Sequence, residues 1–371
     1  MPAPRPRPLI LSCLAHDLHA HAACWGLRRN GCDPLWISSW ADPALEPVSL
    51  HCDALDGVRA CGTAHVPSVW YRRPRLPEAF AGANAADRPF LRNEWGRFIN
   101  NLQASPDAWD DVLWVNRPEA AIAAENKLTQ LRAARAVGLA FPATLMSADP
   151  VRIREFAASH RRIVYKPFQT HSWQDSDSGR IFSTYARVVE ADMLDDDASL
   201  RLCPGIFQAL VDKTADLRVI LVGEHAYAVR LATSGDATFI DWRAGTLDQA
   251  LSASPATLPG ATLDRLRALM RQLGLVSGSI DLVVDADGDV HFLEINQAGQ
   301  FLFLEDALPG LPLLQTMCAL LASGRSDCEP SAIAGVSYAA YLASEEHARW
   351  WETVRDGIRA ADGTIPGVSV E

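Results

Sequence analysis

The sequence predicts an α/β protein made of several α+β lobes, and three observations support this class. The chain has 371 residues, of which 49% are hydrophobic, so it can form more than one packed core. Apolar runs of strand length alternate with segments of helical periodicity along the chain. The chain also begins with a strand, a helix and a second strand, an order typical of α/β folds. We therefore expect two or three packed lobes.

The first lobe is predicted to span residues 1–117. Asp17 is interpreted as the N-cap of its first helix. The neighbouring histidines could instead form a metal site, but His19 and His21 are two residues apart and would point to different sides of a helix. The elements expected in this lobe are strands at 9–14, 34–39, 69–74 and 111–116 and helices at 18–30 and 94–103.

Two further lobes and an appendage are predicted at 118–204, 205–328 and 329–371. Residues 119–137 have helical periodicity, which Gly138 ends, and the polar segment 168–183 is predicted to be a mobile loop. The appendage is interpreted as a packing element, with a role in oligomerisation or partner contact as the alternative. The other expected elements are strands at 162–167, 181–185, 205–211, 216–222, 226–231 and 239–241 and helices at 150–159, 262–273 and 345–360.

Charge and composition exclude several classes of function. The net charge of −11 and the pI near 5.4 argue against a general nucleic-acid-binding protein, because neutralising phosphates needs basic stripes. No apolar stretch reaches the roughly 20 residues of a membrane-spanning helix, and the Pro/Arg-rich start has no signal-peptide core. The eight cysteines form no Cys-x-x-Cys pair, so reduced thiols are expected. These observations predict a cytoplasmic protein that binds neither nucleic acid nor membrane.

A predicted β-hairpin at residues 281–296 is the most informative segment for function. Glu294 and Asn296 are two residues apart, so they share one face of a strand. The Asp287-Gly288 pair is typical of a hairpin turn, which folds Asp281 back toward Glu294. Two carboxylates and an amide oxygen then converge, as Mg²⁺ prefers. The alternative, an acidic surface hairpin, is disfavoured because the strand is otherwise apolar.

Lysine is rare in this chain and occupies three notable places. Arginine provides most of the positive charge, and the only lysines are Lys127, Lys166 and Lys213. Lys127 lies at the start of a predicted helix and Lys166 at the end of an apolar strand. A lysine ammonium is well suited to phosphate oxygens. The two lysines therefore indicate a phosphate site, whereas Lys213 could equally be a solvated lysine at a strand end.

The order and approximate spacing of these residues resemble the ATP-grasp ligases over about residues 115–320. This resemblance implies an ATP-grasp fold in which two α+β lobes hold ATP, preceded by an α/β domain. It also implies activation of a carboxylate as an acylphosphate, which a nucleophile then attacks. The residues that carry the resemblance are Lys127, Lys166, residues 208–211 and 216–219, Arg230, Asp281 and residues 292–296.

The resemblance assigns roles to these positions. Lys127 and Lys166 would bind phosphates, and residues 169–180 would close over them. Asp216 would bind the ribose hydroxyls of ATP. Many relatives have glutamate where Gln208 stands, but an amide can still accept the proton of the adenine amino group. The residues that meet adenine would be Gln208, Ala209, Leu210 and Val211, with Lys213 nearby. The residues that hold Mg²⁺ would be Asp281, Glu294 and Asn296.

A second set of strings, over residues 60–310, resembles the graspetide (microviridin-type) peptide maturases. The strings are Trp-Tyr-Arg-Arg-Pro at 70–74, residues 114–118, 125–128 and 241–243, and Glu-Ile-Asn-Gln-Ala-Gly-Gln-Phe at 294–301. Members of that group phosphorylate an Asp or Glu side chain of a ribosomal precursor peptide. A Thr, Ser or Lys side chain then attacks, giving a lactone or lactam. The resemblance implies a precursor peptide, leader plus core, as partner, and a homodimer as a further expectation.

The arginines of the last lobe suit carboxylates and phosphoryl oxygens. Arg218 and Arg230 are expected on neighbouring strands, with Arg230 at the γ-phosphate or acylphosphate. Arg243 and Asp241 are assigned to the acceptor-peptide region, with a structural ion pair between them as the alternative. Of Arg72 and Arg73, one is expected in an ion pair that stabilises the fold and one in the cleft. The general base stays open among Asp212, Asp216 and Asp241.

Two competing functions remain at this level. One is an ATP-grasp ligase that adds amino acids to a protein terminus or a small acid, like the ribosomal-protein glutamate ligases, but nothing in that pattern requires residues 70–74. The other is a nucleotide-binding regulatory protein without turnover, which the intact lysines and hairpin acids disfavour. The primary prediction is an ATP- and Mg²⁺-dependent peptide macrocyclase.

Overall fold

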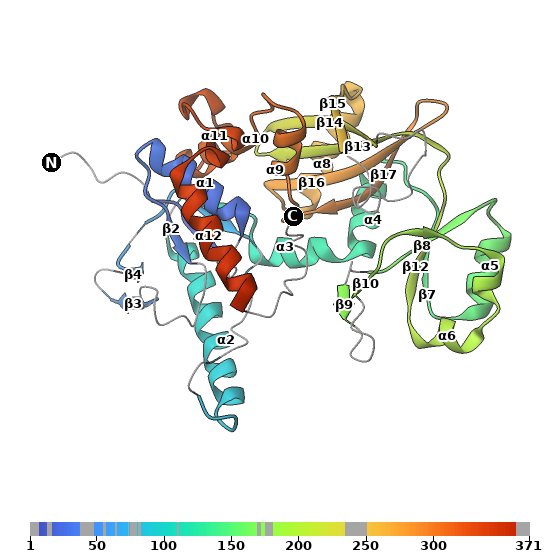
Figure 1. Ribbon diagram of the computed structural model, residues 1–371, viewed down its shortest axis with the longest axis horizontal. Helices are drawn as coiled ribbons and strands as arrows, with labels where there is room; N and C mark the ends of the chain where they lie inside the picture. The colour runs from blue at the N-terminus through green and yellow to red at the C-terminus, as the bar shows by residue number, and fades with distance from the viewer. Residues whose placement is uncertain are drawn as a thin grey trace.

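The computed structural model describes residues 7–12, 17–37, 48–54, 57–63, 65–72, 74, 80, 83–109, 111–168, 172–174, 181–233 and 251–360. Its N-terminal part, a small parallel sheet with helices, agrees with the predicted strand–helix–strand beginning (Figure 1). The sheet has the order β2-β1-β5-β6. The elements of this part are β1 (Leu9–Leu11), α1 (Leu18–Arg29), β2 (Leu35–Ile37), β3 (Leu50–Asp53), β4 (Gly57–Ala60), β5 (Ser68–Tyr71), α2 (Arg88–Ala104), η1 (Ser105–Ala108) and β6 (Leu113–Val115).

Helix α1 begins where the sequence predicts. The Asp17 side chain accepts hydrogen bonds from the backbone N–H groups of His19 and Ala20, at 3.1 and 3.4 Å. This satisfies donors that the first turn of a helix leaves without partners. The N-cap interpretation of Asp17 is therefore confirmed.

A second, four-stranded antiparallel sheet forms the central lobe, at the right of Figure 1. Its order is β11-β8-β12-β7, and Ile153, Ile163 and Phe207 form its small buried core. The elements here are β7 (Thr144–Ser147), α5 (Pro150–Ala158), β8 (Ile163–Lys166), the hairpin strands β9 (Ser172–Gln174) and β10 (Ile181–Ser183), β11 (Arg187–Val188), η2 (Ala191–Leu194), α6 (Asp197–Leu202) and β12 (Gly205–Ala209).

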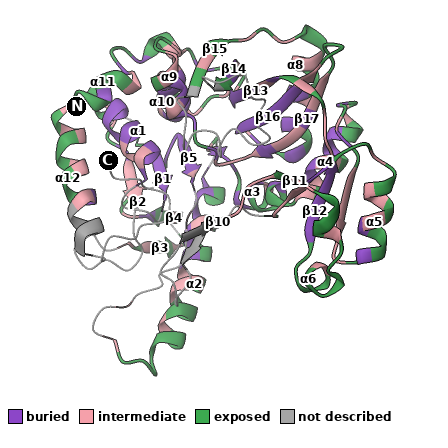
Figure 2. Cartoon of the chain, turned by 45° about the vertical axis from the view of Figure 1, so that its right-hand side comes forward, coloured by how far each residue is buried: buried purple, intermediate pink, exposed green. Residues whose placement is uncertain are grey.

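The largest sheet has five antiparallel strands in the order β15-β14-β13-β16-β17. Its buried strands form the purple layer in Figure 2. Helices α3 and α4 pack on this sheet together with α8, so residues 118–136 share the core of the C-terminal lobe, not that of the central lobe. The elements are α3 (Pro118–Glu125), α4 (Lys127–Ala136), β13 (Lys213–Val222), β14 (His225–Thr233), β15 (Leu251–Pro255), α8 (Gly260–Leu273), β16 (Ser277–Asp285) and β17 (Val290–Asn296).

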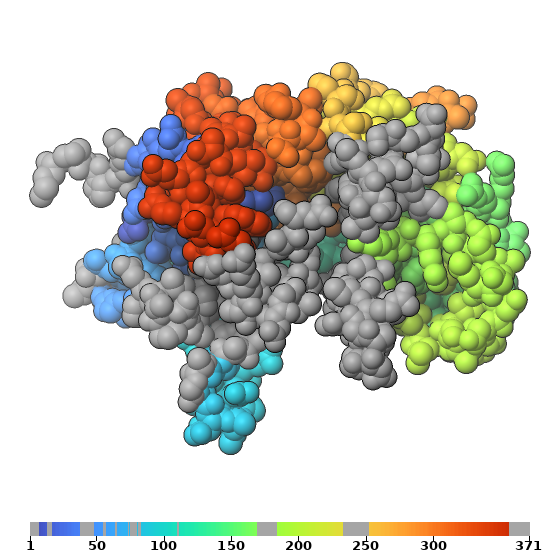
Figure 3. Space-filling model, in the orientation of Figure 1, coloured from blue at the N-terminus to red at the C-terminus, as the bar shows by residue number. Residues whose placement is uncertain are grey.

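The other face of this sheet shares a core with the N-terminal part. Ile220 and Val222 of β13 pack in one cluster with Trp25 and Trp70. The last helix, α12, lies against α1, as the red and blue surfaces in Figure 3 show, and Arg28 pairs with Glu346 at 2.7 Å. The remaining elements are α9 (Leu302–Ala307), α10 (Leu313–Ser323), η3 (Pro330–Ala332), α11 (Tyr338–Leu342) and α12 (Glu345–Ala360).

Among the described residues, no helix is both long enough and apolar enough to cross a membrane. The predicted strand at 239–241 and most of the predicted loop at 169–180 lie outside the described residues.

Candidate active site

The predicted hairpin forms the centre of the candidate site. Strands β16 and β17 pair antiparallel, with Asp281 directly opposite Glu294 and Ser279 opposite Asn296. Residues that are directly opposite each other point to the same face of a sheet. Asp281, Glu294 and Asn296 therefore share one face.

A β-bulge in β17 makes this arrangement compatible with the core. The register shifts between Asp281 and Leu282, which pair with Glu294 and Phe292, so Leu293 is the extra residue. Phe292 and Ile295 are three residues apart, yet both are buried, with exposed fractions of 0% and 1%. Strict alternation would bury Glu294 on the face of Phe292. The bulge keeps Glu294 and Asn296 on the face opposite the core.

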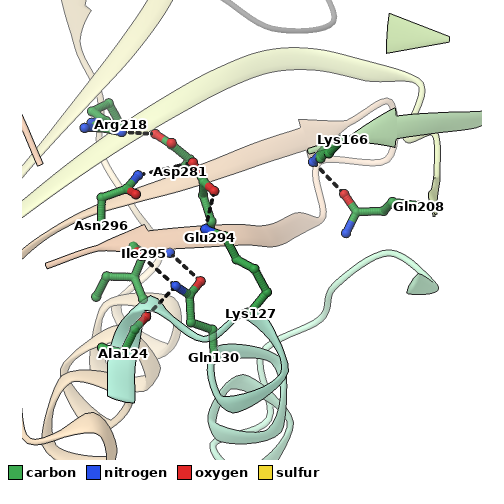
Figure 4. A network of polar contacts seen from close by, with 10 residues as sticks. All are labelled: Ala124, Lys127, Gln130, Lys166, Gln208, Arg218, Asp281, Glu294, Ile295 and Asn296. Carbon is green, nitrogen blue, oxygen red and sulfur yellow. Dashed lines mark hydrogen bonds and ion pairs between the residues drawn. The ribbon is translucent and has the colours of Figure 1, made fainter. Parts of the chain in front are cut away.

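Asp281 and Glu294, the two carboxylates of the predicted metal set, each contact a cationic side chain (Figure 4). The Nζ of Lys127 lies 2.6 Å from Oε2 of Glu294, and Asn296 donates from Nδ2 to Oε1 of the same carboxylate at 3.2 Å. On the next strands, Nη1 of Arg218 donates to Oδ1 of Asp281 at 2.6 Å. The structure thus brings together five of the predicted site residues, from one helix and three adjacent strands.

Lys127 reaches the hairpin because the helical segment 119–137 is not one helix. The structure confirms that Lys127 begins a helix, and it divides the region of helical periodicity at Asn126, where α3 ends and α4 begins. Asn126 caps α4, because its side chain accepts the N–H of Thr129 at 3.0 Å. The break places Lys127 on the first turn of α4, beside the edge strand β17, with α4 contacting β17.

A second polar group lies in the central lobe. Lys166 donates from Nζ to Oε1 of Gln208 at 2.7 Å, and Gln208 donates from Nε2 to the hydroxyl of Thr144 at 2.9 Å. Gln208 is buried, with 4% of its surface exposed. The structure therefore pairs the second predicted phosphate lysine with the residue predicted beside adenine.

The segment predicted to meet adenine leaves the central lobe after β12. The backbone N–H groups of Ala209 and Leu210 donate to Ala143 and Arg162, each at 2.9 Å. These two donors are therefore occupied within the lobe. Adenine recognition by this stretch would have to use its carbonyl oxygens or Val211.

Lys213 and Asp216 form an ion pair at the start of β13, where Nζ lies 2.7 Å from Oδ1. The Lys213 side chain is only 9% exposed. The alternative of a solvated strand-end lysine is therefore wrong. A ribose hydroxyl bound to Asp216 would share that carboxylate with Lys213.

Arg230 lies apart from the other arginine of this sheet. In the register of β13 and β14, Arg230 lies opposite Leu217, which is buried in the core under α4 and α8. Arg218 lies opposite Val229. Neighbouring residues of a strand point to opposite faces, so Arg230 and Arg218 lie on opposite faces of the sheet. Arg230 is exposed and donates to the Thr214 carbonyl at 2.8 Å. Asp241 and Arg243 lie outside the described residues.

Of Arg72 and Arg73, the structure shows Arg72 in an ion pair that stabilises the fold. Arg73 lies outside the described residues. The Nε of Arg72 lies 2.9 Å from Oδ2 of Asp17, and both side chains are almost fully buried. Burial alone would raise the pKa of Asp17, but Arg72 and His19 hold this pKa below its usual value. Arg72 also donates to the Ala298 carbonyl at 3.3 Å. Two of the strings that resemble the peptide maturases, at 70–74 and 294–301, therefore touch each other.

The chemistry of the hairpin fits a hard divalent cation. Among the described residues, no group of three or more His, Cys, Asp or Glu side chains is arranged to hold a metal ion. The predicted set has only two carboxylates, with Asn296 as a third source of oxygen. The Lys127 ammonium already occupies a cation position beside Glu294. Oxygen ligands that face a cation suit Mg²⁺.

Comparisons with known proteins agree with this geometry. No family model matches the sequence, and no curated protein matches it. The macrocyclase MdnC from Microcystis aeruginosa MRC, solved bound with precursor peptide MdnA, is 25% identical with a TM-score of 0.70, covering 84% of this chain and 98% of its own. The macrocyclase MdnB from the same organism is 25% identical with a TM-score of 0.65, covering 85% and 99%. The chain shares its fold with these two macrocyclases, which supports a graspetide-type ATP-grasp ligase.

A third structure has the same fold. The Chryseobacterium gregarium RiPP-associated ATP-grasp ligase, solved with ADP and a leader and core peptide, is 22% identical with a TM-score of 0.75, covering 87% of this chain and 98% of its own. The three structures confirm the predicted fold class, and the two macrocyclases at 25% identity confirm the predicted ATP-dependent ligase.

Sequence reasoning missed several polar residues that support the candidate site. Gln130 is 1% exposed and bonds to the backbone of Ile295, and Asn116, also 1% exposed, bonds to the backbone of Ser277 and Gln297. Thr144 holds Gln208. For Gln130 a signal exists, because it precedes the buried Ala134 by one helical turn. A polar residue on the buried face of a helix needs partners.

Proposed function

We propose that this ligase joins side chains within a ribosomal precursor peptide. In the first step, an Asp or Glu carboxylate oxygen of the peptide attacks the γ-phosphorus of ATP, and ADP leaves. In the second step, a Thr or Ser hydroxyl, or a Lys amine, attacks the acyl carbon, and phosphate leaves as the nucleophile loses its proton. The product is an intramolecular ester or amide, and each ring removes one water from the peptide.

The observation that carries the proposal is the polar cluster of Lys127, Arg218, Asp281, Glu294 and Asn296. It combines cations for phosphoryl oxygens, from α4 and β13, with oxygen ligands for a metal on the hairpin predicted to hold Mg²⁺. It lies in a chain that matches, over nearly the full length of MdnC, a macrocyclase solved with its precursor peptide. The partner proposed for this chain is accordingly a precursor peptide with leader and core.

The residues divide into two groups by the part of ATP that they would bind. Lys127 and Lys166 would bind phosphates, and Arg218 would hold Asp281 in place. Asp281, Glu294 and Asn296 would hold Mg²⁺, which neutralises phosphate charge when bound. The base and ribose would meet Gln208, Ala209, Leu210, Val211, Lys213 and Asp216. Asp241 and Arg243 stay proposed for the acceptor region, whereas Arg230 is not in the phosphate group because of its face of the sheet.

The remaining predictions are kept as proposals. These are the domain boundaries at 117, 204 and 328, the cytoplasmic location and the homodimer. Residues 118–136 are predicted in the central lobe, but the packing of α3 and α4 supports counting them with the C-terminal lobe.

The test is incubation with ATP, Mg²⁺ and a candidate precursor encoded beside the gene, followed by mass spectrometry. We expect the peptide to lose one water mass per ring, only when ATP and Mg²⁺ are present. Mass gains that match added amino acids would instead show a glutamate-ligase-like activity. Binding of ATP without any turnover of several such peptides would contradict the proposal.

A further inference from the structure

Gln130 makes an unusually complete set of contacts beside the candidate metal hairpin. Its Nε2 donates to the carbonyl of Ala124 at 2.6 Å and to the carbonyl of Ile295 at 2.8 Å. Its Oε1 accepts the N–H of Ile295 at 3.0 Å. Figure 4 shows the amide between the end of α3 and strand β17. All the polar atoms of this buried side chain are therefore used.

The contact with Ile295 replaces a neighbouring strand. Strand β17 is at the edge of the sheet, so half of its backbone groups face away from β16. In an antiparallel pair these groups alternate by residue. The N–H and C=O of Ile295 face Gln130, whereas Glu294 and Asn296 on either side pair with Asp281 and Ser279 of β16. The segment 294–296 is thus held from both sides.

The contact with Ala124 connects the same glutamine to Lys127. Ala124 lies in the last turn of α3, where carbonyl groups lack partners within the helix. Gln130 satisfies this carbonyl from the first turns of α4, across the break at Asn126. One side chain therefore joins the corner that carries Lys127 to the strand that carries Glu294. The two groups of the 2.6 Å ion pair, Lys127 and Glu294, are held at a fixed separation.

We propose that Gln130 is a positioning residue for the metal and phosphate groups, an inference that rests on the proposed function. Gln130 does not touch the nucleotide or the metal. It fixes the backbone of Ile295, and thereby the directions of Glu294 and Asn296, relative to Lys127. Supporting residues of this kind change metal affinity or activity by about 10- to 100-fold when they are replaced.

The main test uses Gln130→Leu, which keeps the side-chain volume but removes all three hydrogen bonds. Gln315→Leu is the control, because Gln315 is a half-buried residue of α10 that also donates to a backbone carbonyl, that of Ile333 at 2.5 Å. ADP binding is measured by calorimetry with and without Mg²⁺. For Gln130→Leu we expect affinity with Mg²⁺ to fall about 10-fold or more and affinity without Mg²⁺ to change less than about 3-fold. Gln315→Leu should leave both affinities unchanged.

Hydrogen exchange provides a readout that needs no ligand. The Ile295 N–H is protected by Gln130. Peptides covering 292–297 should therefore exchange faster in Gln130→Leu than in the wild type, while peptides from the central lobe keep their rates. Unchanged exchange at 292–297, or a wild-type Mg²⁺ response in Gln130→Leu, would overturn the inference. If the wild-type protein itself shows no Mg²⁺-dependent ADP binding, the proposed function fails, and the exchange result still decides the role of Gln130.

Gln130→Glu gives a test that does not depend on the stability of the leucine variant. A carboxylate cannot donate to the Ile295 carbonyl, but a protonated carboxyl can donate to it while accepting the Ile295 N–H. We expect the Mg²⁺-dependent ADP affinity of this variant, relative to the wild type, to recover by about 3-fold or more as the pH falls from 8 to 6, because burial favours the protonated form. A ratio that stays constant over this range would contradict the inference.

Discussion

The two polar ends of the candidate site are built differently. The hairpin end joins Lys127, Arg218, Asp281, Glu294 and Asn296 from one helix and three strands, above a sheet with large cores on both faces. At the central-lobe end, Lys166, Gln208 and Thr144 come from three strands of one small sheet, whose described core has Ile153, Ile163 and Phe207 as its buried residues. The residues proposed for the metal and phosphates are thus held by the body of the protein. The residues proposed for the nucleotide base lie in a lobe with a smaller described core, and we expect this lobe to be the part that adjusts when nucleotide binds.

The largest expected effect is at the hairpin end. Glu294→Gln keeps the shape but removes the charge that faces Lys127 and the metal. We expect turnover to fall about 100- to 1,000-fold, because the charge that develops in the transition state is stabilised less well. The melting temperature should change little. Turnover of the precursor peptide and thermal unfolding are measured together. The exposed Glu224→Gln serves as control, and near-normal turnover of Glu294→Gln would remove this residue from the site.

The second prediction concerns the stability of the N-terminal part that supports the hairpin end. Arg72→Met leaves Asp17 buried without its cation and removes the contact to Ala298. We expect the free energy of unfolding to fall by about 3–5 kcal/mol at pH 7. The pKa of Asp17 is lowered in the folded protein, so its contribution is present above its unfolded value of about 3.8 and is lost as the pH falls through the folded value. The difference between the proteins in denaturant unfolding should therefore shrink below pH 4. A constant difference would show that Arg72 acts by packing alone.

A smaller effect is expected at the central-lobe end. Lys166→Met removes one charge-assisted contact to phosphate and frees Gln208. We expect the KM for ATP to rise about 10-fold, with a smaller change in kcat. Arg161→Met is a control in the same lobe, because that arginine is highly exposed. A loss confined to kcat would show that Lys166 belongs functionally with the hairpin end, and the contrast between the two ends would then be wrong.

The smallest effect is expected at Arg230, which we place outside the hairpin end. Arg230 lies on the opposite face of the sheet from Arg218 and is exposed. We expect Arg230→Ala to change kcat/KM by less than about 3-fold, whereas Arg218→Ala should cost far more because it leaves the Asp281 carboxylate buried without its partner. Steady-state kinetics of the two variants decide this. A loss of orders of magnitude in Arg230→Ala would return it to the phosphate group, as the sequence alone suggests.

Elements set by local chemistry could be predicted from the sequence. The N-cap at Asp17, the hairpin with its Asp-Gly turn and the helix at 345–360 all follow from neighbouring residues. Strand periodicity places Glu294 and Asn296 on one face, but their convergence with Asp281 also needs the bulge at Leu293, which periodicity does not reveal. The family resemblance added Lys127 and Lys166.

The rest depends on partners that are distant in the chain. Lys127 is predicted at a helix start, but its contact with Glu294 depends on the packing of α4 against β17, which helical periodicity does not reveal. The face that Arg230 occupies depends on its register with Leu217, which strand patterns alone do not specify. The role of Gln130 becomes visible only when Ile295, 165 residues away, lies against it.

The bulge at Leu293 sets which face of the sheet Glu294 occupies. If Leu293 paired with β16 in a regular ladder, Glu294 would turn to the face of Phe292. Deleting Leu293 would instead make Phe292 and Glu294 neighbours on a regular strand, and each would keep its present face. The side chain of Leu293 is not what sets the faces, so substitutions there are expected to be tolerated. Among related ligases of this fold, we expect the identity of this residue to vary.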